Sequence, residues 1–196
     1  MATDTHIIDS TYFINEILIP GTENPNSGVC QLLCSIIDIY EEKYLTGIFG
    51  YAFYRYVIDT IAATAPDNVP QELIDLIDGV DYYDDQGCLT KWQGLRKHTA
   101  QFCYYWFYRT EMTQTTNYGQ LIPKTENGAI VAASWKMSDA FNKSQAGARD
   151  CIDFLNANAA NYPQWQSCGD GSDWFIRNLP PPSPDCGGDY MNVFGL

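Results

Sequence analysis

Residues 89–112 read LTKWQGLRKHTAQFCYYWFYRTEM, an aromatic-rich stretch near the middle of the chain. From Trp92 onward, apolar side chains recur at steps of three and four residues, the spacing that places side chains on one face of an α-helix. The pattern therefore predicts a long helix over residues 89–112. Its apolar face consists of Trp92, Leu95, Thr99, Phe102, Cys103, Trp106 and Phe107.

The run of five aromatic residues at positions 104–108 is too dense for one face of this helix. Tyr104, Tyr105 and Tyr108 fall outside the apolar face, and tyrosine is enriched at protein interfaces. We therefore expect a partner molecule to cover some of these three side chains.

The charge changes sign just before this helix. Residues 67–85 carry seven carboxylates and no Lys or Arg, whereas residues 87–110 carry only basic charges. This charge pattern has two interpretations. The charges of the two segments either balance each other within one molecule or form a salt-sensitive contact between neighbouring molecules. The basic residues are Lys91, Arg96, Lys97 and Arg109.

Helical spacing continues on both sides of the aromatic stretch. Residues 27–44 and 53–61 each carry an apolar face, and the glycines between them predict that the two helices meet at an angle. Pro70 and Gly79 bracket a short predicted helix over residues 71–78, in the usual order of proline first and glycine last.

Loops are predicted over residues 82–87 and 113–128, before a last helical segment over residues 129–160. Gly147 is a potential break in that segment, because glycine weakens a helix interior. Together these elements predict a mainly α protein, a helical bundle of about four to five helices.

The two ends of the chain differ in composition from the middle. Residues 1–26 contain short apolar runs closed by a Pro-Gly turn, which predicts an extended N-terminal arm. Residues 163–196 are rich in proline and glycine, which predicts an extended tail after a helical domain of residues 27–162. The tail offers apolar anchors at Trp174, Phe175 and Phe194.

Length, charge and cysteines limit the class of protein. With 196 residues and 45% apolar residues, the chain can build one domain with a sizeable core. A net charge of −13 disfavours wrapping by nucleic acid but suits a surface past which DNA slides. No apolar run approaches the roughly 20 residues of a membrane span. Seven cysteines without a CxxC pair, and no signal-peptide pattern, predict a reduced cytosolic chain.

Sequence motifs for common catalytic sites are missing. The chain has no GxSxG, HExxH, GxGxxG or GxxxxGK[ST] segment. This absence weakens the case for an enzymatic function without excluding it. A nucleophilic thiolate could form if His98 met Cys103 or Cys151, because an imidazole can lower a thiol pKa. Buried free cysteines usually only pack, so a structural role is favoured.

Neither of two potential metal sites has a full ligand set, and no cofactor is expected. Cys30 and Cys34 lie one helical turn apart, but a tetrahedral site needs two more ligands. The acidic cluster resembles half of a calcium loop, without the DxDxDG order and the closing Glu. It is expected to be a solvated acidic loop or a contact with a neighbouring subunit. The cluster is Asp81, Asp84 and Asp85.

Several short motifs follow one another in a characteristic order: Ile19-Pro20, YEEKYL at 40–45, Gly50-Tyr51, LIDG at 76–79, WQGL at 92–95 and Tyr162-Pro163. Over roughly residues 10–165 this order resembles the head–tail connector (adaptor) proteins of tailed phages. The resemblance is strongest to those of phages and prophages of gut Bacteroidales, crAss-like phages among them.

The resemblance implies a virion structural protein, assembled in the host cytoplasm, that forms a ring in the neck. Such rings are commonly of twelve copies, lie beneath the portal and use arms or tails to grip adjacent subunits. The implied partners are other copies of the chain, the portal protein and tail or neck proteins, with DNA passing through the lumen without specific binding. No catalytic residues follow from the resemblance.

In such a ring we expect the acidic segment of one subunit to face the basic helix of the next. Two alternatives stay open: a small cytosolic enzyme with a Cys/His site, and a non-virion phage binding module. The expected ring contact involves Asp81, Asp84 and Asp85 on one side and Arg96 and Lys97 on the other.

Overall fold

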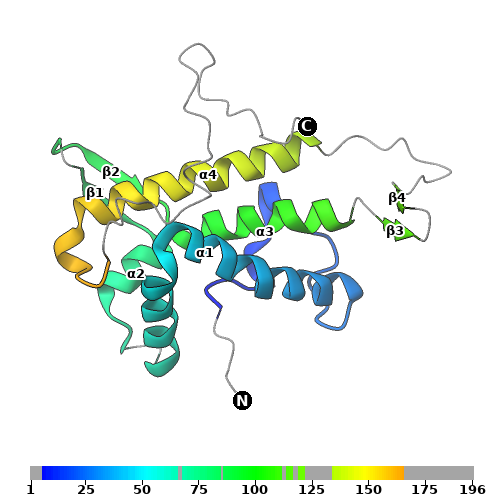
Figure 1. Cartoon of the computed structure of the whole chain (residues 1–196), viewed down its shortest axis with the longest axis horizontal. Coiled ribbons are helices and arrows are strands. Elements are labelled where there is room, and N and C mark those ends of the chain that lie inside the picture. Colours follow the sequence, from blue (N-terminus) through cyan, green and yellow to red (C-terminus); the bar gives the residue numbers. More distant parts are fainter. Residues whose placement is uncertain are drawn as a thin grey trace, which may run out of the picture.

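The computed structural model describes residues 6–65, 68–84, 86–111, 114–116, 119–121 and 134–165. Within these ranges the chain is mainly α-helical, which confirms the predicted fold class. The helices are α1 (Gly28–Ala63), α2 (Gln71–Asp78), α3 (Leu95–Glu111) and α4 (Ser134–Ala157). Figure 1 shows α3 and α4 running side by side, with α1 along the other flank of α3.

Helix α1 bends at Gly50, as the glycines of this region predicted. Gly50 has a φ of 73° and a ψ of 159° inside the helix, a conformation that glycine adopts without the steric penalty of a Cβ. The two helices predicted over residues 27–44 and 53–61 are therefore the two halves of one kinked helix. Ser27 caps its start, where the side-chain oxygen accepts a hydrogen bond from the Cys30 amide at 3.0 Å.

A β-hairpin lies where the sequence predicted a loop at residues 82–87 and the first turn of the long helix. Strands β1 (Val80–Tyr83) and β2 (Leu89–Trp92) pair in antiparallel register, and α3 begins only at Leu95. Side chains alternate between the two faces of the hairpin, so that Tyr83 is exposed and Trp92 is buried. The predicted helix start was wrong because Trp92 fits both helical spacing and strand alternation.

The base of the hairpin is held by a close approach of two backbone segments. A Cβ on Gly94 would lie 2.5 Å from the backbone of Asp78, and a Cβ on Gly79 would lie 2.5 Å from the Trp92 carbonyl oxygen. Their φ values, 84° at Gly94 and 97° at Gly79, also favour glycine. The Trp92 indole N–H donates a hydrogen bond to the Leu76 carbonyl at 2.8 Å, which fixes the hairpin on α2.

Helix α3 is enclosed on several sides, which accounts for its aromatic run. It contacts α1, α2, α4 and two short 3-10 helices of the N-terminal arm, η1 (Ser10–Tyr12) and η2 (Asn15–Ile17). Tyr104 and Tyr105 are buried and Tyr108 is half-buried. Contrary to the expectation from the sequence, no partner is needed to cover Tyr104 and Tyr105, because the chain covers them itself.

Within the described part of the predicted segment 129–160, helix α4 ends at Ala157, and Gly147 does not break it. This glycine serves packing instead, because a Cβ at its position would lie 2.1 Å from the His98 ring of α3. The second predicted loop contains a short antiparallel pair of strands, β3 (Gln114–Thr116) and β4 (Gly119–Leu121).

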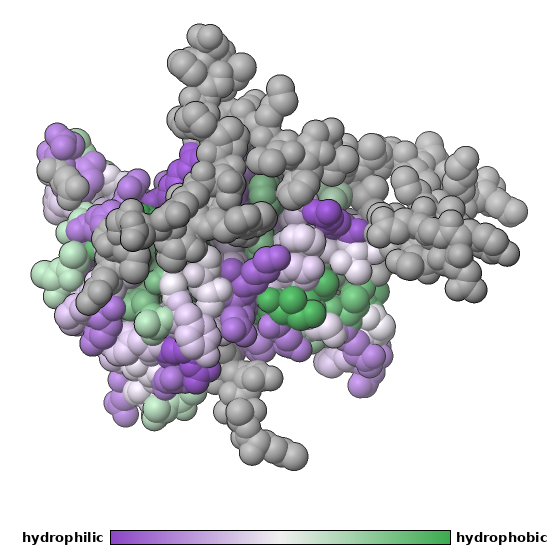
Figure 2. Space-filling model, in the orientation of Figure 1, coloured by the Kyte–Doolittle hydropathy of each residue, from purple (hydrophilic) through white to green (hydrophobic). Residues whose placement is uncertain are grey.

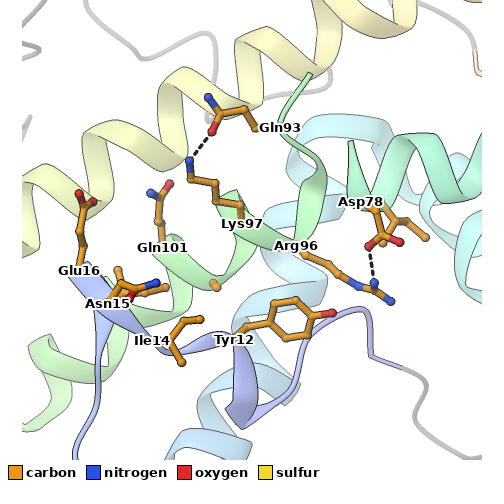
Figure 3. Close-up of a pocket in the computed structure, with 12 residues that line it drawn as sticks. Tyr12, Ile14, Asn15, Glu16, Asp78, Gln93, Arg96, Lys97 and Gln101 are labelled. Carbon is orange, nitrogen blue, oxygen red and sulfur yellow. Dashed lines mark hydrogen bonds and ion pairs between the residues drawn. The ribbon is translucent and has the colours of Figure 1, made fainter. Parts of the chain in front are cut away.

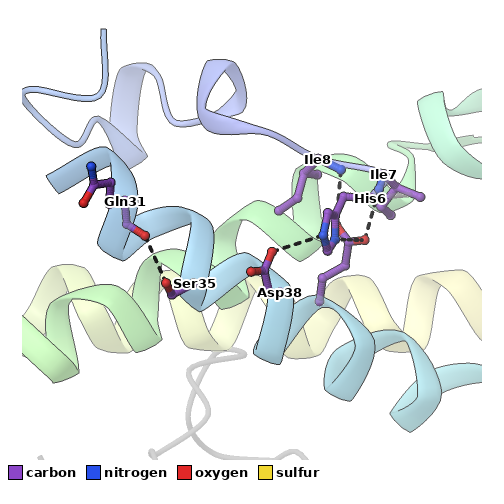
Figure 4. A network of polar contacts seen from close by, with 7 residues as sticks. His6, Ile7, Ile8, Gln31, Ser35 and Asp38 are labelled. Atoms are coloured by element: carbon purple, nitrogen blue, oxygen red, sulfur yellow. Dashed lines mark hydrogen bonds and ion pairs between the residues drawn. The ribbon is translucent and has the colours of Figure 1, made fainter. Parts of the chain in front are cut away.

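The N-terminal arm packs against α1 (Figure 4). The buried Glu41 carboxylate accepts hydrogen bonds from the backbone amides of Ile7 at 3.0 Å and Ile8 at 3.2 Å. The His6 ring lies between two carboxylates of α1, 3.3 Å from Glu41 and 3.1 Å from Asp38. The described part of the arm is thus held by its own chain.

The described residues end after a short 3-10 helix, η4 (Ala159–Asn161). The predicted tail anchors Trp174, Phe175 and Phe194 lie outside the described residues, and the predicted domain boundaries stay predictions. No helix in the part of the chain that the structure describes combines the length and apolar character needed to cross a membrane.

Candidate functional site

A surface groove runs beside the arm, between η2 and the helices α3 and α4. It consists of two hollows, of about 470 and about 420 Å³, which share Asn15, Glu16, Ile17 and Gln101 as lining residues. Hollows of this size fall in the range of binding pockets, about 300–1,000 Å³. We call the two hollows together the arm groove, and Figure 3 shows the one that adjoins α2.

The arm groove combines apolar residues at its edge with a polar residue at its floor. Ile14 and Trp135, which are 55% and 64% exposed, line one hollow each. Gln101 lines both hollows, is only 4% exposed, and its side chain contacts His98. Such a surface can receive apolar side chains from a partner.

Basic side chains outnumber carboxylates around the arm groove, although the whole chain has 24 acidic and 11 basic residues. The local charge therefore differs in sign from the net charge of the protein. The basic residues are Arg96, Lys97, Lys136 and Lys143, and the carboxylates are those of Glu16, Asp78 and Asp139.

Arg96 is engaged within its own chain. Its Nε donates a hydrogen bond to the Ile7 carbonyl at 2.8 Å, and its guanidinium forms an ion pair with Asp78. The guanidinium carbon also lies 5.5 Å from the centre of the Tyr12 ring, within the range of a cation–π contact. The contact between the basic helix and the acidic segment thus exists at Arg96, but within one molecule, where it holds the arm.

Two lysines of the arm groove are tied to neighbouring side chains. Lys97 donates a hydrogen bond to Gln93 and stays exposed (Figure 3). Lys143 contacts the carboxylates of Glu16 at 2.7 Å and Asp139 at 2.9 Å. Hydrogen bonds to Asp139 and Glu16 raise the pKa of Lys143, and the bond from Lys143 lowers the pKa of Glu16. Lys143 therefore stays protonated and links α4 to the arm.

The acidic residues of the hairpin have different roles. Asp84 shapes the turn, because its Oδ1 accepts hydrogen bonds from the backbone amides of Gln86 at 2.9 Å and Cys88 at 2.8 Å. Asp81 is exposed on β1, directly opposite Lys91 on β2. Asp85 lies outside the described residues. Of these two described residues, Asp84 has a structural role in the turn and Asp81 does not.

The most exposed apolar side chains of the hairpin escaped the sequence analysis. Tyr83 and Leu89 face each other across the two strands, 68% and 66% exposed. Neither residue belongs to an apolar helical face or to a charge cluster, so neither stood out in the sequence. Recognising the strand alternation of residues 80–92 would have found them.

The alternative catalytic group lacks the electrostatics of an activated thiol. Burial lowers the pKa of His98 to about 4, although contact with the Gln101 side chain acts in the opposite direction. Burial also raises the pKa of Cys103 and of Cys151 well above the usual thiol range, with the nearby Asp150 adding to the effect at Cys151. An imidazolium–thiolate pair requires the reverse of both shifts.

Potential metal ligands were the other chemical alternative in the sequence. Among the described residues, no group of three or more His, Cys, Asp or Glu side chains is arranged to hold a metal ion. Cys30 is buried and Cys34 is exposed, and His6 is directed to the carboxylates of α1.

The described molecule is thus a mainly α domain with a groove beside its arm and an exposed apolar pair on its hairpin. The chain belongs to a family of unknown function (DUF6712), whose profile matches residues 45–173. Neither the curated proteins nor the solved structures contain a significant match. The matched segment includes the hairpin, α3 and α4, whereas η2 and the rest of the arm precede it.

Proposed function

We propose that this chain is a virion structural protein, the subunit of a head–tail connector ring through which DNA passes between portal and tail. The order of short motifs that resembles connector proteins supports this function, and the mainly α fold is compatible with it. The protein works by geometry and interface burial, with no cofactor and no turnover.

The observation that carries the proposal is the distribution of exposed apolar side chains over several elements. A ring subunit between portal and tail needs contacts to two neighbours and to proteins above and below it. Figure 2 shows apolar surface gathered over α1 on one face. Exposed apolar residues lie on the arm, α1, the hairpin and α4: Ile14, Leu18, Ile39, Tyr51, Tyr83, Leu89 and Trp135.

The charge of the chain also suits the wall of a DNA channel. A net charge of −13 makes the average surface repel phosphates, so that DNA slides past it without adhering. The basic residues around the arm groove are partly neutralised by carboxylates of the same groove, as the contacts of Lys143 with Glu16 and Asp139 show. The groove therefore suits a protein partner better than DNA.

The experiment that tests this function measures the chain in virus particles. Particles from producing cells are separated on a density gradient, and the chain and the portal protein are quantified by mass spectrometry in the DNA-filled band. We expect a ratio close to one chain per portal subunit, with an abundant host cytosolic protein as the contamination control. A chain depleted to the level of that control would overturn the virion function and favour a non-virion binding module.

A further inference from the structure

We propose that the Tyr83–Leu89 pair of one copy docks into the arm groove of the next copy, which makes a head-to-tail contact around the ring. This inference rests on the ring proposed above and names the surfaces by which neighbouring subunits join. The Tyr83–Leu89 pair thus takes the place of Arg96, which we expected from the sequence to contact the neighbouring subunit. Arg96 is engaged with Asp78 and Ile7 of its own chain.

The hairpin presents a suitable projection. Tyr83 and Leu89 are directly opposite in the register and lie next to the turn, and both are more than 60% exposed. Their strands are anchored at the other end, where Trp92 is buried and bonded to the backbone of α2. Because aromatic side chains on a fixed support are favoured as interface anchors, this pair suits insertion into a pocket.

The arm groove presents a suitable receptor. Ile14 and Trp135 offer apolar contacts in its two hollows, 55% and 64% exposed. The Tyr83 ring and the Leu89 side chain would cover these apolar residues when they enter the groove. The contact would therefore remove exposed apolar surface from water on both copies.

Charge complementarity selects a second copy as the occupant. The exposed face of the hairpin carries Asp81 beside the apolar pair, with Lys91 directly opposite it, and Asp84 lies in the adjoining turn, so that the described residues of the hairpin carry two carboxylates and one lysine. Around the arm groove basic side chains outnumber carboxylates, although the net charge of the whole chain is negative. Lys97 and Lys136 are exposed there and available to the incoming carboxylates.

The position of the two surfaces makes the contact intermolecular. In Figure 1 the hairpin projects from one end of the molecule, while the arm packs along α3 toward its middle. The base of the hairpin is fixed on α2 by the Trp92 hydrogen bond to the Leu76 carbonyl. A projection and a receptor at different places on one chain generate a heterologous contact, which closes into a ring when the rotation permits.

Photo-crosslinking from position 83 tests the contact directly. Tyr83 is replaced by the photo-crosslinking residue p-benzoylphenylalanine, both in purified chain at high concentration and in particles, with a mixture of 14N- and 15N-labelled copies for the purified sample. We expect crosslinks to peptides that contain Ile14, Lys97 or Trp135, with the two isotopes mixed. Crosslinks from position 83 only to a different protein, or none to the groove in either preparation, would overturn the proposal.

Paired variants test the direction of the contact. Tyr83→Ser should weaken self-association by at least about 30-fold, the effect of losing one interface anchor, whereas Glu42→Ser, at an exposed residue of α1, should leave it unchanged. A hairpin-defective chain mixed with a groove-defective Trp135→Ser chain should form dimers and nothing larger, because one intact contact is left per pair. Larger assemblies from this mixture, or equal losses for Tyr83→Ser and Glu42→Ser, would contradict a head-to-tail contact.

The two proposals can fail separately. A chain that is present in particles at the portal ratio, but whose position 83 crosslinks to another protein, keeps the connector function and loses this contact. A chain that is absent from particles, but whose purified copies crosslink from position 83 to the groove, loses the connector function and keeps the contact.

Discussion

Replacing His98 with glutamine should remove much of the loss of stability that we expect for the protein between pH 7 and pH 5. The His98 ring packs against Gly147 and stacks on Trp92, with ring centres 5.5 Å apart and planes 29° apart. Burial holds the pKa of His98 at about 4 in the folded protein, below its ordinary value of 6.5. Glutamine is neutral over this range and of similar size, so it removes the titration.

The sign and size of the effect follow from the two pKa values. As the pH falls below 6.5, the unfolded chain binds a proton at His98 while the folded protein does not, so stability is lost as the pH falls from about 6.5 toward 4. For these values the loss between pH 7 and pH 5 is about 2 kcal/mol. That is a large part of the free energy of unfolding of a typical domain, about 5–15 kcal/mol.

Urea unfolding followed by tryptophan fluorescence at pH 7, 6 and 5 measures this loss. Other titrating groups contribute to both proteins, so the difference between wild type and His98→Gln isolates His98. Wild type should lose about 2 kcal/mol more than the variant between pH 7 and pH 5. Parallel pH profiles would refute the reasoning, and His98→Phe, which keeps an aromatic ring against Trp92, gives an independent repeat.

Three further predictions follow from contacts described above. Glu41→Gln should lower the free energy of unfolding by about 1–3 kcal/mol, because an amide N–H replaces one of the two oxygens that accept hydrogen bonds from the arm's backbone amides. Hydrogen exchange at those amides should accelerate. Unchanged protection from exchange would argue against the contact. Gly147→Ala should destabilise the protein by about 1–3 kcal/mol, because the new Cβ overlaps with the His98 imidazole. Gly28→Ala should not, because a Cβ at position 28 lies near no other atom within 4 Å. Equal melting temperatures of the two variants would contradict this prediction. Iodoacetamide at neutral pH should modify exposed Cys88 well before buried Cys151, and rapid labelling of Cys151 in the folded protein would revive the catalytic alternative.

Local signals were enough to predict α2 and the bend of α1 from the sequence. Helix α2 occupies the predicted residues 71–78, because Pro70 and Gly79 mark its ends and no distant contact is needed to place them. The bend of α1 followed from glycine at position 50, whose conformation is a property of the residue type. Prediction succeeded where a single residue restricts its own backbone.

The hairpin and the site depended on contacts between distant residues, which one sequence does not reveal. The glycine at position 94 is required by the approach of two backbone segments, and the same approach restricts Gly79 in addition to its local role at the end of α2. Charge pattern did identify Arg96 and Lys97, and both line the arm groove. It could not show that Arg96 binds Ile7, which lies 89 positions earlier in the chain. The role of Arg96 was therefore assigned to a neighbouring molecule instead of its own arm.

The arm that lines the groove is synthesised first, and one of its ion pairs is completed only late in synthesis. The ion pair between Glu16 and Lys143 joins residues that are 127 positions apart. At about 5–20 residues per second, a ribosome takes about 6–25 s to make the intervening chain. During that interval Phe13 and Ile19, which the finished protein buries, belong to a core that is incomplete, because its residues on α3 and α4 have not all been made. The yield of folded protein should therefore depend on the rate of translation and on chaperones that shield the nascent arm, as much as on the stability of the completed fold.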